Sequence, residues 1–169
     1  LEAATGRVLR VTASGNEEVA NVGLGVDNFT FDADDRLFIS KGSDGSVTRV
    51  DTDGTSTELL PAGMIQPSGL AMINDTVWVA DVFGLKGFDR MTGEQVEEQV
   101  AAPPFASALH TTLNVSADGD NLVIASWFEG RVTVWDPQTQ TPVESYADLF
   151  GPVSAVRYGG GIAITQHYA

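Results

Sequence analysis

Residues 77–80 read Val-Trp-Val-Ala, a short apolar run that occurs in four versions along the chain. The other versions are Leu37–Ser40, Leu122–Ala125 and Ile162–Thr165. Their first residues lie 40, 45 and 40 positions apart. That spacing is the period of a β-propeller blade. The repeat therefore predicts an all-β chain built from propeller blades.

Each repeat divides into four short strands joined by tight turns. A second strand-like series follows each of the first three apolar runs by about a dozen residues, and an earlier copy precedes them all. These segments are Val8–Thr12, Val47–Asp51, Gly87–Asp89 and Val132–Asp136. The turns between strands carry Asp-Gly or Thr-Gly pairs, as at Asp53-Gly54 and Thr92-Gly93. Tight hairpins need a positive φ at their central residues, which these pairs accept. We therefore expect four-stranded antiparallel blades.

The repeat boundaries divide the chain into one propeller segment, residues 1–169. We expect full blades at 26–66, 67–109 and 110–154, with half-blades at 1–25 and 155–169. The two half-blades add up to one blade, since the first supplies its outer strands and the last its inner strands. Two interpretations follow. The ends pair and close a four-bladed ring, or the chain is a fragment of a larger ring that other chains or further residues complete.

The net charge limits the classes of binding partner that we expect. The formal net charge is −14, from 23 acidic and nine basic residues. Such a surface repels phosphate backbones and anionic headgroups, so we expect neither nucleic acid nor a membrane as partner. The acidity is explained by solubility, or by attraction of a cation or a basic partner. The chain has no cysteine and therefore no disulfide or thiolate metal site.

The location is not decided by the sequence. No signal peptide is visible, and the chain begins at Leu1 without an initiator methionine. We expect the native N-terminus to be absent, and a secreted or periplasmic location is compatible with the sequence.

The second repeat carries a more specific pattern. It reads Gln66-Pro67-Ser68-Gly69-Leu70-Ala71, then Val77-Trp78-Val79-Ala80-Asp81, then Phe88-Asp89-Arg90-Met91-Thr92-Gly93. This pattern resembles the six-bladed propeller superfamily of NHL-repeat, SMP-30/gluconolactonase, strictosidine-synthase-like and virginiamycin-lyase-like proteins. The resemblance implies a six-bladed ring, with about two blades outside this chain.

The resemblance also implies where ligands bind. In this superfamily they bind at one end of the blades. That end carries the loops that link one blade to the next and the loops from the second to the third strand within each blade. Many lactonase and esterase relatives hold a calcium ion there through Glu, Asp and Asn side chains. One common ligand is an Asn at the position of Ser68, and a neutral hydroxyl suits calcium less well.

The repeat alignment brings a set of differing polar and aromatic residues to this face. They are Asp27, Lys41, Asp44, Ser68, Asp81, His110, Thr111, Ser126, Trp127, Glu129, Gln166 and His167.

Five members of this set carry specific expectations. Asp81, with Asp27, is the candidate calcium ligand, but an aspartate in this position also caps adjacent turn amides. His110 and His167 are the only histidines and the candidate catalytic bases, since histidine titrates near neutral pH. Trp127 either forms an aromatic wall for a ligand or covers the flank of the neighbouring blade.

Two kinds of function follow. The preferred one is a propeller scaffold that binds a small ligand or a protein partner at this loop face. The alternative is an enzyme: a calcium-dependent lactonase or esterase, or a histidine-dependent lyase.

Overall fold

The computed structural model describes residues 1–100, 109 and 112–167, and this part of the chain consists of β-strands and turns without a helix. Three four-stranded antiparallel sheets form the blades. The first blade contains β3 (Val26–Phe31), β4 (Leu37–Lys41), β5 (Ser46–Val50) and β6 (Ser56–Leu60). The second contains β7 (Pro67–Ile73), β8 (Thr76–Asp81), β9 (Gly84–Asp89) and β10 (Gln95–Val100). The third contains β11 (Thr112–Asp118), β12 (Asn121–Ser126), β13 (Arg131–Asp136) and β14 (Thr141–Tyr146).

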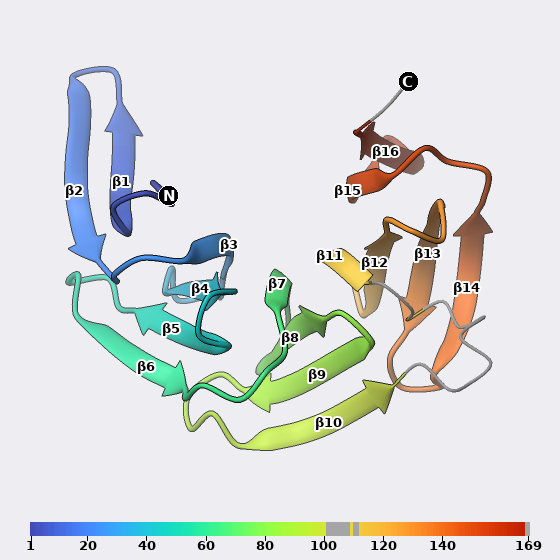
Figure 1. The fold of residues 1–169 in the computed structure, drawn as a ribbon, viewed down its shortest axis with the longest axis horizontal. Coiled ribbons are helices and arrows are strands. Elements are labelled where there is room, and N and C mark those ends of the chain that lie inside the picture. The colour runs from blue at the N-terminus through green and yellow to red at the C-terminus, as the bar shows by residue number, and fades with distance from the viewer. Residues whose placement is uncertain (101–108, 110–111, 168–169) are drawn as a thin grey trace.

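A two-stranded hairpin stands at each end of the three blades. The N-terminal hairpin is β1 (Arg7–Thr12) with β2 (Gly15–Asn21), and the C-terminal hairpin is β15 (Pro152–Tyr158) with β16 (Gly161–Gln166). The five sheets form an open arc, and the two hairpins lie at its opposite ends as separate sheets (Figure 1). The ends therefore do not pair into a four-bladed ring. The C-terminal hairpin begins three residues before the expected Ala155.

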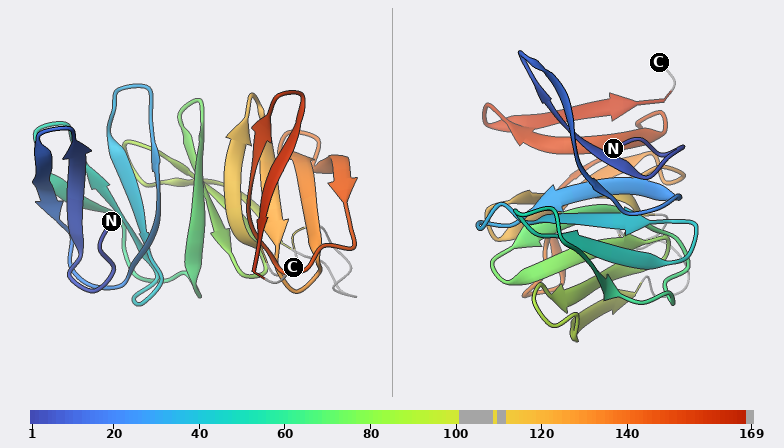
Figure 2. Two further views of the ribbon diagram at one scale, coloured as in Figure 1. Left: turned by 90° about the horizontal axis from the view of Figure 1, so that it is seen from above. Right: turned by 90° about the vertical axis from the view of Figure 1, so that its left-hand side faces the viewer.

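The connections between strands gather at two opposite ends of the sheets (Figure 2). We call one end, which lies at the bottom in the left view of Figure 2, the upper loop face. It carries the links between second and third strands, residues 42–45, 82–83 and 127–130, and the links between blades. The lower loop face carries the remaining hairpin turns, such as residues 32–36 and 90–94.

Apolar packing between neighbouring sheets holds the arc together. Each central strand is buried on both faces, so its consecutive residues enter different interfaces. In β4, Phe38 packs towards the second blade while Ile39 packs towards the N-terminal hairpin, and neither is exposed. Burying such a side chain contributes about 1.5–3 kcal/mol. This explains why the central strands are apolar on successive residues instead of alternating.

The inner strands approach one another most closely at Gly69 in β7. A Cβ at this position would lie 2.4 Å from the backbone N of Val115 in β11. Gly69 belongs to a bulge, because Pro67 faces Asp81 while Leu70 already faces Val79. The corresponding register shift occurs at the start of β3, β11 and β15. The glycine of the Pro-Ser-Gly sequence is therefore required by the contact between blades.

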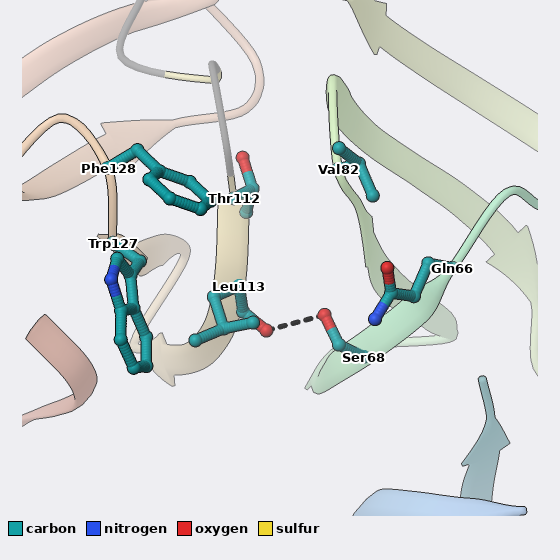
Figure 3. Close-up of a pocket in the computed structure, with 7 residues that line it drawn as sticks. All are labelled: Gln66, Ser68, Val82, Thr112, Leu113, Trp127 and Phe128. Carbon is teal, nitrogen blue, oxygen red and sulfur yellow. Dashed lines mark hydrogen bonds between the residues drawn. The ribbon is translucent and has the colours of Figure 1, made fainter. Parts of the chain in front are cut away.

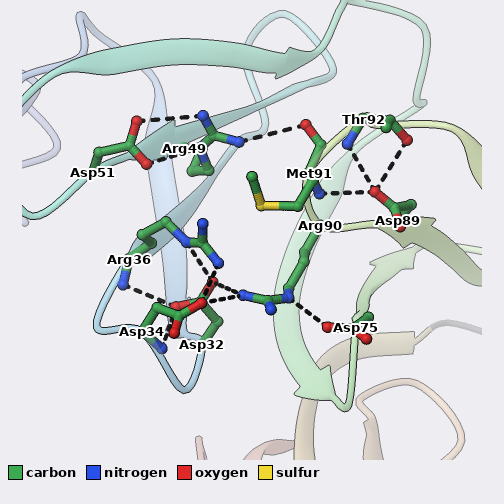
Figure 4. A network of polar contacts seen from close by, with 10 residues as sticks. All are labelled: Asp32, Asp34, Arg36, Arg49, Asp51, Asp75, Asp89, Arg90, Met91 and Thr92. Atoms are coloured by element: carbon green, nitrogen blue, oxygen red, sulfur yellow. Dashed lines mark hydrogen bonds and ion pairs between the residues drawn. The ribbon is translucent and has the colours of Figure 1, made fainter.

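An ion-pair network joins the first two blades on the lower loop face (Figure 4). Asp32, only 1% exposed, binds Arg36 at 2.8 Å and Arg90 of the second blade at 2.7 Å. Arg90 also reaches Asp34 at 2.9 Å and Asp75 at 2.8 Å. Burial opposes the ionisation of Asp32, but hydrogen bonds from the two arginines and from backbone amides outweigh it and lower its pKa. The turn at 32–35 is thus a structural link between the first two blades.

Replacing Gly69 by alanine should destabilise the protein by at least about 2 kcal/mol, because the new methyl group meets backbone that cannot move away. Urea unfolding measures the change. The matched control is Gly161→Ala in β16, where the nearest atom lies 3.8 Å from the new Cβ, and it should cost little. Equal stability of the two variants would contradict the close approach of β7 and β11.

Asp32→Asn should lower the free energy of unfolding by about 2–3 kcal/mol, because it leaves two arginines with a neutral partner. The lowered pKa means that the ionised Asp32 stabilises the fold above its unfolded pKa of about 3.9 and that this contribution disappears as the pH falls through its native pKa. Between neutral pH and pH ~3 the free energy of unfolding should therefore change less with pH in the variant than in the wild type. Asp34→Asn is the control: its side chain is 61% exposed, and the loss should stay below about 1 kcal/mol.

Candidate functional site

A pocket of ≈ 310 Å³ opens on the upper loop face between the second and third blades. In Figure 3 two aromatic side chains stand on one side of it and residues of the second blade on the other. Its lining consists of Gln66, Ser68, Val82, Thr112, Leu113, Trp127 and Phe128.

The pocket lies beside the shortest of the three loops that join the second and third strands of a blade. The links from the second to the third strand span four residues in the first and third blades, 42–45 and 127–130, but only residues 82–83 in the second. In the longer loops the Gly45 and Gly130 carbonyls accept hydrogen bonds from the backbone N–H of Met64 and Leu149. In the short loop the Val82 carbonyl takes this role and accepts the N–H of Thr112 at 3.1 Å. The link between the second and third strands is therefore two residues shorter in the second blade than in its neighbours.

Val82 holds a strained conformation in this loop. Its φ is +47°, in the left-handed region, and the Phe83 N–H donates to the Asp81 carbonyl across it at 2.5 Å. Two-residue hairpin loops normally place Gly, Asn or Asp at such positions, and a β-branched residue there is an outlier. The strain costs roughly 1–2 kcal/mol. Residues held in this way concentrate at functional sites, and here the strained side chain lines the pocket.

The hydroxyl groups of the pocket are engaged with the backbone. Ser68 Oγ donates to the Leu113 carbonyl at 2.5 Å, which also links the inner strands of two blades. Thr112 Oγ1 donates to the Leu109 carbonyl at 2.8 Å. The side-chain amide of Gln66 has no hydrogen bond within the described ranges, so it is one polar group that the pocket can offer to a ligand. The rest of the lining is apolar or aromatic.

Trp127 lies between the pocket and the residue that follows the C-terminal hairpin. Its ring lies 6.5 Å from that of Phe128 at 45°, and 4.8 Å from that of His167. Trp127 therefore covers the C-terminal hairpin through His167 and also lines the pocket. Phe128 is 83% exposed.

Asp81 is a structural residue in this structure. One carboxylate oxygen accepts the backbone N–H of Gln66 at 2.8 Å, and the other pairs with Lys86 at 2.8 Å. Asp81 thereby anchors the segment that carries Gln66 into the pocket. This matches the capping role considered for it in the sequence.

The described residues do not fit a calcium ion. Calcium takes six to eight oxygen ligands, and within 1–100, 109 and 112–167 no group of three or more acidic or histidine side chains could hold a metal. Asp27 lies on β3, outside the pocket lining. We therefore derive no chemistry through calcium.

The other predicted residues are scattered over the upper loop face. Lys41 pairs with Asp44 at 3.0 Å, and Gln166 accepts the backbone N–H of Phe150 at 2.7 Å. Ser126 is buried and Glu129 is exposed, and neither lines the pocket. His110 and Thr111 lie outside the described residues. Of the predicted set, the pocket thus brings together Ser68 and Trp127.

Four lining residues were not among the predicted site residues: Gln66, Val82, Thr112 and Leu113. One signal was available: residues 82–83 form a loop two residues shorter than its counterparts, with valine where a tight turn needs glycine or asparagine. Leu113 gave no such signal, because it lines the pocket only through the bulge in β11.

Comparison with known proteins confirms the propeller fold. No protein-family model matches the sequence, and no curated protein matches it. Among solved structures, a catalytically inactive histidine-to-alanine variant of virginiamycin B lyase from Staphylococcus aureus with quinupristin has a TM-score of 0.76 at 19% identity. The match covers 96% of this chain and 57% of that one. Regucalcin, a calcium-binding protein from Agrobacterium tumefaciens, has a TM-score of 0.67 at 17% identity, covering 97% of this chain and 66% of that one.

A chain of the nidogen/laminin complex matches with a TM-score of 0.71 at 13% identity, over 86% of this chain and 57% of that one. The chain thus has a β-propeller fold and spans little more than half the length of the lyase. No helix among the described residues is long and apolar enough to cross a membrane.

Val82→Gly should leave the free energy of unfolding unchanged or raise it by up to about 1 kcal/mol, because relief of strain exceeds the backbone entropy cost of glycine. Chemical unfolding tests this. The same change at Val79, fully buried in β8, should cost more than about 2 kcal/mol. A loss of more than about 1 kcal/mol at Val82 would show that its conformation is not strained.

Proposed function

We propose that this propeller segment is a binding scaffold whose upper pocket takes a small, largely apolar molecule with one hydrogen-bonding group. The observation that carries the proposal is the strained Val82 facing the exposed aromatic wall of Trp127 and Phe128. A fold that only needed a stable turn would place glycine at residue 82.

The size and chemistry of the pocket support a small ligand. Small-molecule sites occupy roughly 300–1,000 Å³ and combine apolar walls with few polar groups. The ≈ 310 Å³ pocket meets the lower bound and presents the amide of Gln66 as its polar group. A compact ligand of about ten non-hydrogen atoms suits it. A protein partner would instead use Phe128 as an anchor in a broader contact.

A lyase is the second candidate. His167 lies against Trp127 with 4.8 Å between ring centroids, which brings a candidate general base next to the pocket wall. One structural relative is a lyase that was inactivated by replacing a histidine and solved with quinupristin. Mass spectrometry of quinupristin incubated with this chain and with His167→Ala tests the candidate. A product that depends on His167 supports it, and unchanged quinupristin removes it for that substrate.

Binding can be tested with benzyl alcohol, a soluble aromatic molecule with one hydroxyl group, observed by saturation-transfer NMR. Phe128→Ala should weaken binding about tenfold, since a buried aromatic contact contributes on the order of 1.5 kcal/mol. Because Phe128 is 83% exposed, its loss should not change stability.

Phe150→Ala is the matched control. Phe150 is 69% exposed on another upper loop but does not line the pocket. Its replacement should leave benzyl alcohol binding intact. The proposed site is wrong if both variants bind as the wild type does, or if the wild type does not bind.

A further inference from the structure

The link between the first and second blades, residues 61–66, carries Gln66 to the pocket. Five of its six residues are exposed, so packing alone does not fix its course. Two hydrogen bonds fasten it to the blades. The Met64 N–H donates to the Gly45 carbonyl at 3.2 Å, and the Gln66 N–H donates to the Asp81 carboxylate at 2.8 Å. The second bond fixes the backbone of the pocket residue itself.

The Asp81 carboxylate is held in place by a second partner. Its side chain is only 2% exposed, and the oxygen that does not bind Gln66 pairs with Lys86 at 2.8 Å, across the short loop 82–83. A buried carboxylate that lost such partners would be strongly destabilising, which keeps the three groups together. We call Gln66, Asp81 and Lys86 the Asp81 clamp.

The Asp81 clamp joins two segments of the pocket wall. Asp81 directly precedes Val82, which lines the pocket, and its carboxylate holds the link that ends at Gln66, which lines it too. Figure 3 shows both residues on the side of the pocket that faces Trp127. Asp81 is not itself among the lining residues. Its influence on a ligand therefore passes through the residues that it holds.

We propose that Asp81 is a positioning residue that gives the pocket its preference for ligands with a hydrogen-bonding group. A Gln66 side chain on a fixed backbone loses less conformational freedom when it binds than one on a mobile link, so its hydrogen bond contributes more to affinity. This inference rests on the proposed function and adds a residue that determines its specificity.

Two probes of nearly equal shape isolate the hydrogen bond: benzyl alcohol, and ethylbenzene, in which a methyl group replaces the hydroxyl. Asp81→Ala should weaken benzyl alcohol binding about three- to fivefold and leave ethylbenzene binding unchanged. Gln66→Ala should have the same selective effect. Because both substitutions act on one hydrogen bond, the double variant should bind benzyl alcohol no more weakly than Gln66→Ala alone. Saturation-transfer NMR measures each affinity.

Two further variants separate positioning from a general structural role. Asp81→Asn keeps an oxygen that can accept the Gln66 N–H, so it should retain most of the affinity for benzyl alcohol. Asp44→Ala is the matched control, because Asp44 is also an upper-loop aspartate paired with a lysine, Lys41 at 3.0 Å, but does not line the pocket. It should leave the binding of both probes unchanged.

The outcomes distinguish the two proposals. Equal weakening of both probes by Asp81→Ala would show a general loss of the pocket and overturn the positioning role. An unchanged affinity for benzyl alcohol, or a double variant weaker than Gln66→Ala alone, would also overturn it while the binding function stands. Failure of both probes to bind the wild type overturns the proposed function itself.

Discussion

The packing of each blade against the next is the constraint on which this structure depends. A four-stranded sheet of this length cannot bury both of its faces alone, so each blade needs its neighbours. The contact is tightest between inner strands, where Gly69 lies against the backbone of β11. Hydrogen bonds from Ser40 to the Ser68 carbonyl and from Ser68 to the Leu113 carbonyl run along the same line. On the lower loop face, the buried carboxylate of Asp32 links the first two blades through its ion pair with Arg90.

The same packing also forms the pocket that we propose as the binding site. Three rigid blades fix the inner strands, and the upper loops differ in length from blade to blade. Where the loop shortens to Val82 and Phe83, a residue with a strained backbone lines the pocket. The stability lost at this turn is small compared with the apolar burial between blades, so the fold tolerates it. The proposed binding site is thus a local departure from an otherwise regular repeat of blades.

The repeat made most of the fold predictable. Apolar runs such as Val77–Ala80 mark central strands because both of their faces are buried, and Asp-Gly and Thr-Gly pairs mark turns with positive φ. The resemblance to the propeller superfamily was correct at the level of fold. The site was less predictable, because symmetry places a dozen residues at the upper face without showing which of them meet. Asp81 was ambiguous in the sequence for this reason, since only the structure shows Lys86 and the Gln66 amide beside it.

Methyl NMR of the chain with added benzyl alcohol tests the central claim that the short loop and the aromatic wall form one binding site. The account predicts shifts at the methyl groups of Val82, Leu113 and Thr112, which line the pocket. Exposed valines at the two ends of the arc, Val11 and Val156, should not shift. Shifts confined to these end residues, or spread evenly over the exposed apolar side chains, would contradict it.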